Sequence, residues 1–182
     1  MKSTVLVKKI LFIVILLLLV SALSFIAFFR SEPVQFNNVT YKKEFSIPIP
    51  DYLTYSNNLD SSAIIQYHSL EKNIFVLVYQ HPITADTLNS YFKQLTSKLT
   101  AAIDRGTLLK YYPEKINGNQ ALIGNIRGSV NETIIYYRIA LIQTGSSFYE
   151  IIWGADENIR SSYDDDMNKT IRGFRIINSK PS

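Results

Sequence analysis

The stretch LLKYYPEKINGNQALIGNIRGSVNETIIYYRIALIQTGSSFYEIIW, residues 108–153, decides the fold of this chain of 182 residues. It contains four runs that are rich in β-branched and aromatic side chains, a composition typical of β-strands. Short segments of turn-forming residues separate the runs, and strands joined so closely pair in the antiparallel direction. We therefore predict four consecutive antiparallel strands over residues 108–116, 120–128, 133–143 and 147–153.

The residues before this stretch predict three more strands. Residues 40–49 form the first, and Pro48 and Pro50 end it. Residues 62–69 and 73–81 form the next two, and the short connection between them predicts a hairpin. Every second side chain of the first strand is expected on one face, namely Tyr41, Lys43, Phe45 and Ile47.

Two amphipathic helices complete the predicted domain. The first begins at Thr84, a natural N-cap, and ends at Gly106. Its apolar side chains recur at spacings of four and three residues, at Leu88, Phe92, Leu95 and Leu99. The second covers residues 158–172, with an inner face formed by Ile159, Tyr163, Met167 and Ile171. This order of elements predicts an α+β domain with an antiparallel sheet of about six or seven strands flanked by two helices.

The N-terminal part of the chain predicts a membrane anchor. Residues 10–29 contain no charged side chain. As a helix they would span about 30 Å, the thickness of the hydrocarbon core of a bilayer. Lys8 and Lys9 precede this segment and Arg30 follows it. The positive-inside rule then predicts a cytoplasmic N-terminus at residues 1–9, a single transmembrane helix and an extracytoplasmic domain.

A cleaved signal peptide is the alternative for this segment. Residues 22–24 fit a small-x-small cleavage site, but the apolar run is longer than the usual apolar region of a signal peptide. Both interpretations place the domain outside the cytoplasm. After the anchor we expect a linker at residues 30–38, a single domain at 39–178 and a short tail at 179–182.

The formal net charge of +4 belongs to the N-terminal segment rather than to the domain. Lys2, Lys8, Lys9 and Arg30 are four of the 19 Lys and Arg residues, so the rest of the chain has 15 basic and 15 acidic residues. A neutral domain gives no reason to predict a nucleic-acid partner. The sequence has no Cys, which excludes disulfide bonds and Cys-based zinc sites.

A resemblance to a known family is carried by packing and turn residues. They are Phe45-Ser46-Ile47-Pro48-x-Pro50, Gly118-x-x-Ala121, Gly145 before Phe148-Tyr149-x-Ile151, and Ile171-x-x-Phe174. On these residues, the sequence from 41 to 177 resembles the PsbP-like and DcrB-like domains. The resemblance implies an α/β/α sandwich in an exported or membrane-associated protein that docks onto a larger complex without catalysis. The chain departs from the family in lacking a lipobox Cys, and the predicted membrane helix would serve the same anchoring purpose.

Side chains that could carry catalysis or bind a metal form no recognisable set. His68 and His81 lie in neighbouring predicted strands and are expected roughly 20 Å apart, too far to share a metal ion. Ser69 and Lys72 match SxxK in spacing only, because the serine of that motif opens a helix. The acidic run 164–166 is interpreted as a solvated helix start. We predict no enzyme activity, no metal and no cofactor.

The aromatic content carries the one functional indication. All 12 Tyr follow the apolar segment, and exposed Tyr is enriched at protein contacts. Tyr111 and Tyr112 are adjacent in one predicted strand, and Tyr136 and Tyr137 in another, so each pair must face both sides of the sheet. These four are the candidate protein contacts. We predict a membrane-anchored, non-enzymatic accessory or docking protein that binds a larger envelope or membrane complex. The alternative is a small-ligand-binding domain with a pocket between sheet and helix.

Overall fold

The computed structural model describes residues 33–84 and 86–177 of the chain. The chain divides into two compact units, Met1–Val34 and Gln35–Ser182, and nearly all the described residues belong to the second. The predicted anchor, its flanking basic residues and the predicted tail lie outside the described residues. Among the residues that are described, no helix has both the length and the apolar character needed to span a bilayer.

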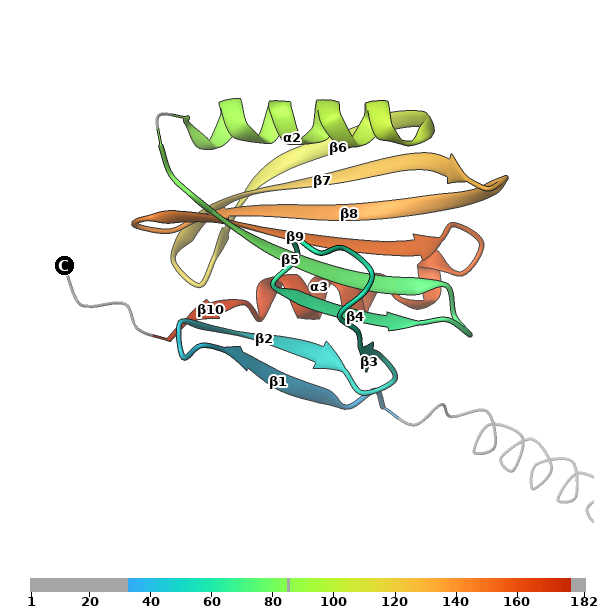
Figure 1. The fold of residues 1–182 in the computed structure, drawn as a ribbon, viewed down its shortest axis with the longest axis horizontal. Helices are drawn as coiled ribbons and strands as arrows, with labels where there is room; N and C mark the ends of the chain where they lie inside the picture. Colours follow the sequence, from blue (N-terminus) through green and yellow to red (C-terminus); the bar gives the residue numbers. More distant parts are fainter. Residues whose placement is uncertain (1–32, 85, 178–182) are drawn as a thin grey trace, which may run out of the picture. The chain divides into compact units, whose positions relative to one another are not determined.

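The second unit is built around an antiparallel sheet of seven strands in the order β3-β4-β5-β9-β8-β7-β6. Its strands are β3 (Thr54–Tyr55), β4 (Ile65–Ser69), β5 (Ile74–Pro82), β6 (Asp104–Ile116), β7 (Asn119–Val130), β8 (Thr133–Gln143) and β9 (Ser147–Asp156). Helix α2 (Leu88–Ala102) covers one face of this sheet (Figure 1). The other face is covered by helix α3 (Asp164–Arg172) together with a second, three-stranded sheet (Figure 1). The second sheet has the order β1-β2-β10 and consists of β1 (Phe36–Tyr41), β2 (Phe45–Pro50) and β10 (Arg175–Ile176).

The four strands predicted over residues 108–153 are confirmed as β6, β7, β8 and β9, and each pairs antiparallel with the next. The turn between β7 and β8 lies at Asn131 and Glu132, with φ of 48° and 68°. The turn between β6 and β7 uses Asn117 and Gly118, with φ of 46° and 85°. Positive φ at both central residues of a two-residue turn matches the twist of the flanking strands. The end predicted for this strand, residue 128, was therefore placed too early, and β7 extends to Val130.

The single strand predicted over residues 40–49 is wrong, because the chain reverses direction there. Lys42 and Lys43 have φ of 45° and 60° and connect β1 to β2, which pair antiparallel. Pro48 and Pro50 lie inside β2 rather than after it. Within the described residues, β10 pairs with β2 only at Phe45 and Ser46. The same edge of β2 is therefore open beside both prolines, and a proline, which has no N–H to donate, is tolerated at an open edge. Strand β1 also begins within the residues assigned to the linker.

Helix α2 is confirmed, but both of its predicted ends were misplaced. Its N-cap is Thr87, whose side chain accepts a hydrogen bond from the backbone N–H of Ser90 at 3.2 Å, and not Thr84. The helix ends at Ala102, and Gly106 already belongs to β6. Gly106 is needed there for space, because a Cβ at this position would collide with the carbonyl oxygen of Thr100. The glycine marks a close approach between the helix and the strand that follows it.

Two apolar layers hold the unit together, one on each face of the large sheet. Strand β9 contributes to both because its side chains alternate: Tyr149, Ile151 and Trp153 face the α3 side, and Phe148 and Ile152 face α2. The last helix, α3, begins at Asp164 rather than at residue 158, so Ile159 lies before it and Tyr163 is its N-cap. Its predicted inner face is confirmed at Met167 and Ile171. Both are buried on the α3 side, Phe174 follows them into the core, and Ile159 and Tyr163 pack against it.

Candidate protein-contact surface

The four candidate tyrosines do not gather on one surface. Each adjacent pair faces both sides of the sheet, as predicted: Tyr112 and Tyr136 pack on the α3 side, and Tyr111 and Tyr137 on the α2 side. Their exposure differs widely. Tyr136 is only 2% exposed, Tyr112 and Tyr137 are partly buried, and Tyr111 is 50% exposed. Tyr111 is therefore the one of the four that offers a large part of its ring to a partner.

Tyr111 lies on β6, the last strand of the large sheet. Within residues 33–84 and 86–177, β6 pairs only with β7, so its other edge is open. Leu109 on the same strand is 49% exposed. Beside β6, a groove of about 560 Å³ lies between the first turn of α2 and the strand. The groove is lined by Leu88, Asn89, Tyr111, Pro113, Glu114, Lys115, Gln120, Ala121 and Leu122. We call strand β6 together with this groove the β6 surface.

A glycine on β7 sets the position of the Tyr111 ring. Gly124 lies opposite Tyr111, and a Cβ at residue 124 would be 2.7 Å from Cζ of Phe92 on α2. The absence of a side chain lets the Phe92 ring lie directly on the sheet. The Tyr111 ring packs against Phe92 with its centroid 5.6 Å away. One face of Tyr111 is thus held by the core, and the other is left for solvent or a partner.

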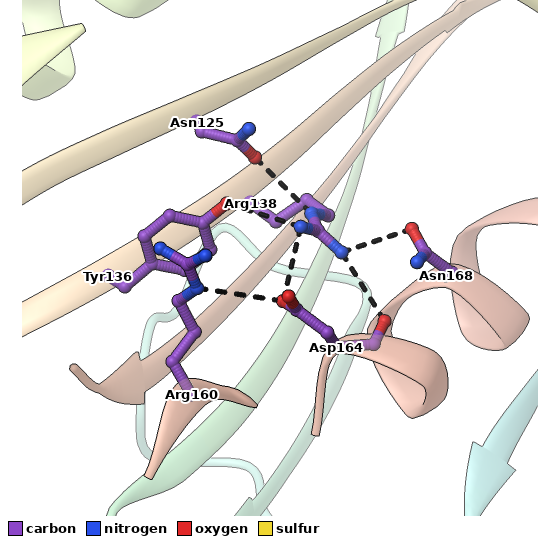
Figure 2. A network of polar contacts seen from close by, with 6 residues as sticks. All are labelled: Asn125, Tyr136, Arg138, Arg160, Asp164 and Asn168. Carbon is purple, nitrogen blue, oxygen red and sulfur yellow. Dashed lines mark hydrogen bonds and ion pairs between the residues drawn. The ribbon is translucent and has the colours of Figure 1, made fainter. Parts of the chain in front are cut away.

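Tyr136 belongs to a buried polar network instead of a contact surface (Figure 2). The network centres on Arg138, whose guanidinium donates to the Tyr136 hydroxyl at 3.2 Å and to Oδ1 of Asn125 at 3.2 Å. It also donates to Oδ1 of Asn168 at 3.0 Å, and to Oδ1 and the backbone carbonyl of Asp164 at 3.2 and 3.3 Å. These bonds attach α3 to the sheet. Sequence reasoning missed Arg138, although a lone arginine within an apolar strand was the available signal.

The acidic run lies at the start of α3, as predicted, but it is only partly solvated. Asp164 forms the ion pair with Arg138 and lies 3.7 Å from Nε of Arg160. Asp166 accepts a hydrogen bond from the Tyr52 hydroxyl at 2.8 Å, and burial raises the pKa of this carboxyl. Asp165 alone is exposed. The run therefore secures the helix to its neighbours.

The two histidines occupy separate parts of the sheet. His68 on β4 pairs with Phe75 on β5, and His81 lies six positions further along β5. Ser69 accepts a hydrogen bond from the backbone N–H of Lys72 at 3.4 Å in the turn between these strands. In the described part of the chain, no three His, Asp or Glu side chains converge as metal ligands would.

His81 has a buried acidic neighbour that sequence reasoning did not identify. Its Nε2 lies 3.4 Å from Oε2 of Glu150, whose side chain is 7% exposed. Burial, and to a lesser extent the nearby Asp60, raises the pKa of Glu150 to about 7, while Lys98 on α2 acts in the opposite direction. Burial and Lys98 lower the pKa of His81. Tyr79 donates to Oδ2 of Asp60 at 2.9 Å and borders the same group. Near pH 7, Glu150 is therefore present in both its neutral and its charged form.

The large sheet, with a helix on one face and a helix and a small sheet on the other, has the fold of a solved PsbP structure. The family resemblance predicted from the sequence is thereby confirmed for the fold. The structure is similar to CyanoP, the cyanobacterial PsbP of Synechocystis sp. PCC 6803. The TM-score is 0.64 with 7% identity, over 81% of this chain and 95% of that one.

Two further solved structures have the same architecture. LpqN, involved in cell envelope biogenesis of Mycobacterium tuberculosis, matches with a TM-score of 0.59 and 12% identity, over 83% of this chain and 95% of that one. The Ran-binding protein Mog1p of Saccharomyces cerevisiae matches with a TM-score of 0.54 and 10% identity, over 80% and 97%. No protein-family profile and no curated protein matches the sequence. The likeness is therefore one of fold.

Proposed function

We propose that this protein is a non-enzymatic docking protein that binds a larger membrane or envelope complex through the β6 surface. Residues 10–29 anchor it in a membrane, and the PsbP-like unit lies on the extracytoplasmic side. The observation that carries the proposal is the open edge of β6, on which Leu109 and Tyr111 are both about half exposed. Large apolar side chains in such positions are typical of protein contacts.

The solved structures with this fold support a binding role. LpqN is described as involved in cell envelope biogenesis, and Mog1p as a Ran-binding protein. Neither description names a chemical reaction. A shared fold carries many functions, so the site on this chain has to bear the argument. The β6 surface offers apolar contact area, and no histidine lines its groove.

A small-ligand-binding domain is the second candidate, since the 560 Å³ groove does lie between sheet and helix. The space directly beneath α2 is filled by the packed side chains of Phe92, Leu122, Leu141 and Phe148. The groove is therefore a surface depression beside the helix, and ligand pockets usually enclose most of a ligand. This geometry favours a side chain of a partner protein as the occupant.

Docking predicts a specific cross-link in intact cells. A photo-reactive amino acid at position 109 of the full-length protein should capture the same partner repeatedly, because Leu109 would lie at the contact. Changing Tyr111 to Ser in this variant should lower the yield at least about tenfold, the loss expected for a central aromatic contact. Lys93, exposed on α2, is the matched control position. Equal capture from positions 93 and 109, or no effect of Tyr111→Ser, would contradict docking at β6. Retention of a small molecule in native mass spectra would favour the second candidate.

The anchor predicts that the full-length protein stays in the membrane fraction after an alkaline carbonate wash. The segment has 20 residues, apolar except for Ser21 and Ser24, and its length matches the bilayer core. Each arginine placed at its centre costs about 2.5 kcal/mol or more. The double variant Ile15→Arg, Leu18→Arg should therefore be released by the wash. Protease added to intact cells should cleave the PsbP-like unit if that unit is extracytoplasmic. A mature protein that begins near Phe25 would show instead that the segment is a cleaved signal peptide.

A further inference from the structure

Strand β6 has an unusually long open edge. It spans 13 residues, and β7 is its only partner strand within the described residues. Its pairing with β7 is irregular between Asp104 and Lys110 and regular from Lys110 to Ile116. The regular part carries main-chain N–H and C=O groups along an edge that no strand of the described chain occupies. Such an edge is a template for an added strand.

Pro113 identifies which residues point to this open edge. A proline has no N–H, so within a sheet it lies where that group would face away from the neighbouring strand. Pro113 is opposite Leu122 of β7, inside the regular part of the strand. Main-chain groups alternate in direction along a strand. The N–H and C=O groups of Tyr111 and Lys115 therefore point to the open edge on either side of Pro113.

The two sides of β6 offer different surroundings to the side chains of an added strand. On the α2 side, the groove presents Leu88, Tyr111 and Pro113, an apolar site next to the open edge. On the α3 side, Glu114 is held by Arg172, with Nε of the arginine 2.7 Å from the carboxylate. Because the side chains of a strand alternate between its faces, every second residue of an added strand would reach the groove.

The charges along the edge indicate an acidic occupant. Lys110 and Lys115 are exposed, and neither has an ion-pair partner among the described residues. The acidic side chain between them, Glu114, is already paired with Arg172. A second copy of this chain would bring its own lysines and its own Pro113 to the shared edge. An acidic segment neutralises the lysines and contributes a full set of main-chain donors.

We propose that β6 receives an extended, acidic segment of the partner protein as an eighth strand, with an apolar side chain of that segment in the groove beside Tyr111. The main-chain groups of Tyr111 and Lys115 provide affinity, and the groove and the two lysines provide selectivity. This inference rests on the proposed docking function and specifies the chemistry of the partner.

The test measures hydrogen exchange of single amides in the isotopically labelled, full-length protein in mild detergent. The probe is a synthetic heptapeptide of alternating Glu and Val with blocked ends. Saturation with this peptide should slow exchange at Tyr111 and Lys115 at least about tenfold, because their N–H groups become bonded. Exchange at Tyr112 and Glu114, whose N–H groups face β7, should change little. Protection spread evenly over all four residues, or none at any of them, overturns strand addition.

Two control peptides separate main-chain pairing from side-chain contact. Methylation of the Val nitrogens removes donors and keeps the side chains, and replacement of Glu by Lys reverses the charge. Both should bind at least about tenfold more weakly than the probe. Equal binding of the methylated peptide overturns strand addition, and equal binding of the Lys peptide overturns the acidic character of the partner. Slowed exchange that depends on protein concentration without peptide identifies a second copy as the occupant and overturns the proposal.

A pair of variants connects this inference to the partner captured in cells. Tyr111→Ala removes the ring and keeps the main-chain N–H, whereas Tyr111→Pro removes both. Strand addition predicts a further loss of cross-linking at position 109 from Tyr111→Ala to Tyr111→Pro of about fivefold or more, with both variants folded. A captured partner with equal losses leaves docking intact and overturns strand addition. The absence of any captured partner overturns docking itself.

Discussion

Replacing Arg138 with alanine is expected to lower the free energy of unfolding by about 2–4 kcal/mol, because Arg138 is only 7% exposed and each buried acceptor that loses its donor costs about 1–3 kcal/mol. The substitution leaves Asn125 and Tyr136 without their donor in the protein interior and removes the bonds that hold Asp164 and Asn168 of α3 to the sheet (Figure 2). Trp153 is the one Trp in the sequence and is fully buried, so its fluorescence reports unfolding of this unit in denaturant.

Arg127 provides the matched control for this substitution. Its Nε lies 2.6 Å from Oε2 of Glu157, a shorter distance than any in the Arg138 network, but its side chain is 47% exposed. An exposed pair contributes about 0–1 kcal/mol, because water screens it and solvates either partner alone. Arg127→Ala should therefore lower the free energy of unfolding by no more than about 1 kcal/mol. Equal losses from both substitutions would show that burial does not set the value of the Arg138 network.

Replacing Glu150 with glutamine is expected to stabilise the protein at alkaline pH. Burial raises the pKa of Glu150 in the folded protein to about 7 from an ordinary value of 4.5. The folded state therefore holds the proton more tightly than the unfolded state does. The stability associated with the neutral carboxyl is fully present below pH 4.5 and is lost as the pH rises through 7. At 1.36 kcal/mol for each pKa unit, the charged form costs about 3 kcal/mol at pH 8 and above.

Glutamine cannot ionise, so Glu150→Gln should raise the free energy of unfolding by about 3 kcal/mol at pH 8 and by little at pH 4.5. Parallel denaturant titrations at both pH values, followed by Trp153 fluorescence, measure this difference. Glu132→Gln, at an exposed turn, is the control and should change stability by no more than about 0.5 kcal/mol. An equal increase in the free energy of unfolding at both pH values would mean that ionisation of Glu150 does not cause the stabilisation.

Most strands and both helices could be predicted because their signals are local. Strand β8 matches its predicted bounds, since its apolar run ends at turn residues on both sides. The hairpin of β1 and β2 was missed because its turn is formed by Lys42 and Lys43 with positive φ, a conformation that lysine seldom signals. The N-cap was misplaced because Thr84 and Thr87 are equivalent by composition, and only the hydrogen bond to Ser90 distinguishes them.

The candidate site could be predicted only in part. The alternation of Tyr111 with Tyr112, and of Tyr136 with Tyr137, followed from the two-residue period of a strand. Which tyrosine is exposed depends on the strand that carries it. Strand β6 is an edge strand, whereas β8 is central and the ring of its Tyr136 lies beneath the guanidinium of Arg160, 4.2 Å from the ring centroid. Predicting the exposure of each tyrosine therefore required the order of the strands in the sheet, which the local sequence pattern does not contain.

By itself, the sequence determined an α+β unit with consecutive antiparallel strands, two amphipathic helices and paired tyrosines on opposite faces. These features depend on residues close together in the chain, where periodicity and turn chemistry act. The tertiary structure alone decided that β5 pairs with β9, that β6 remains at the edge, and that Arg138 and Glu150 are buried. Burial depends on which distant segments pack over a residue. A charged side chain within an apolar strand consequently has its partners, its ionisation and its exposure set by contacts across the whole fold.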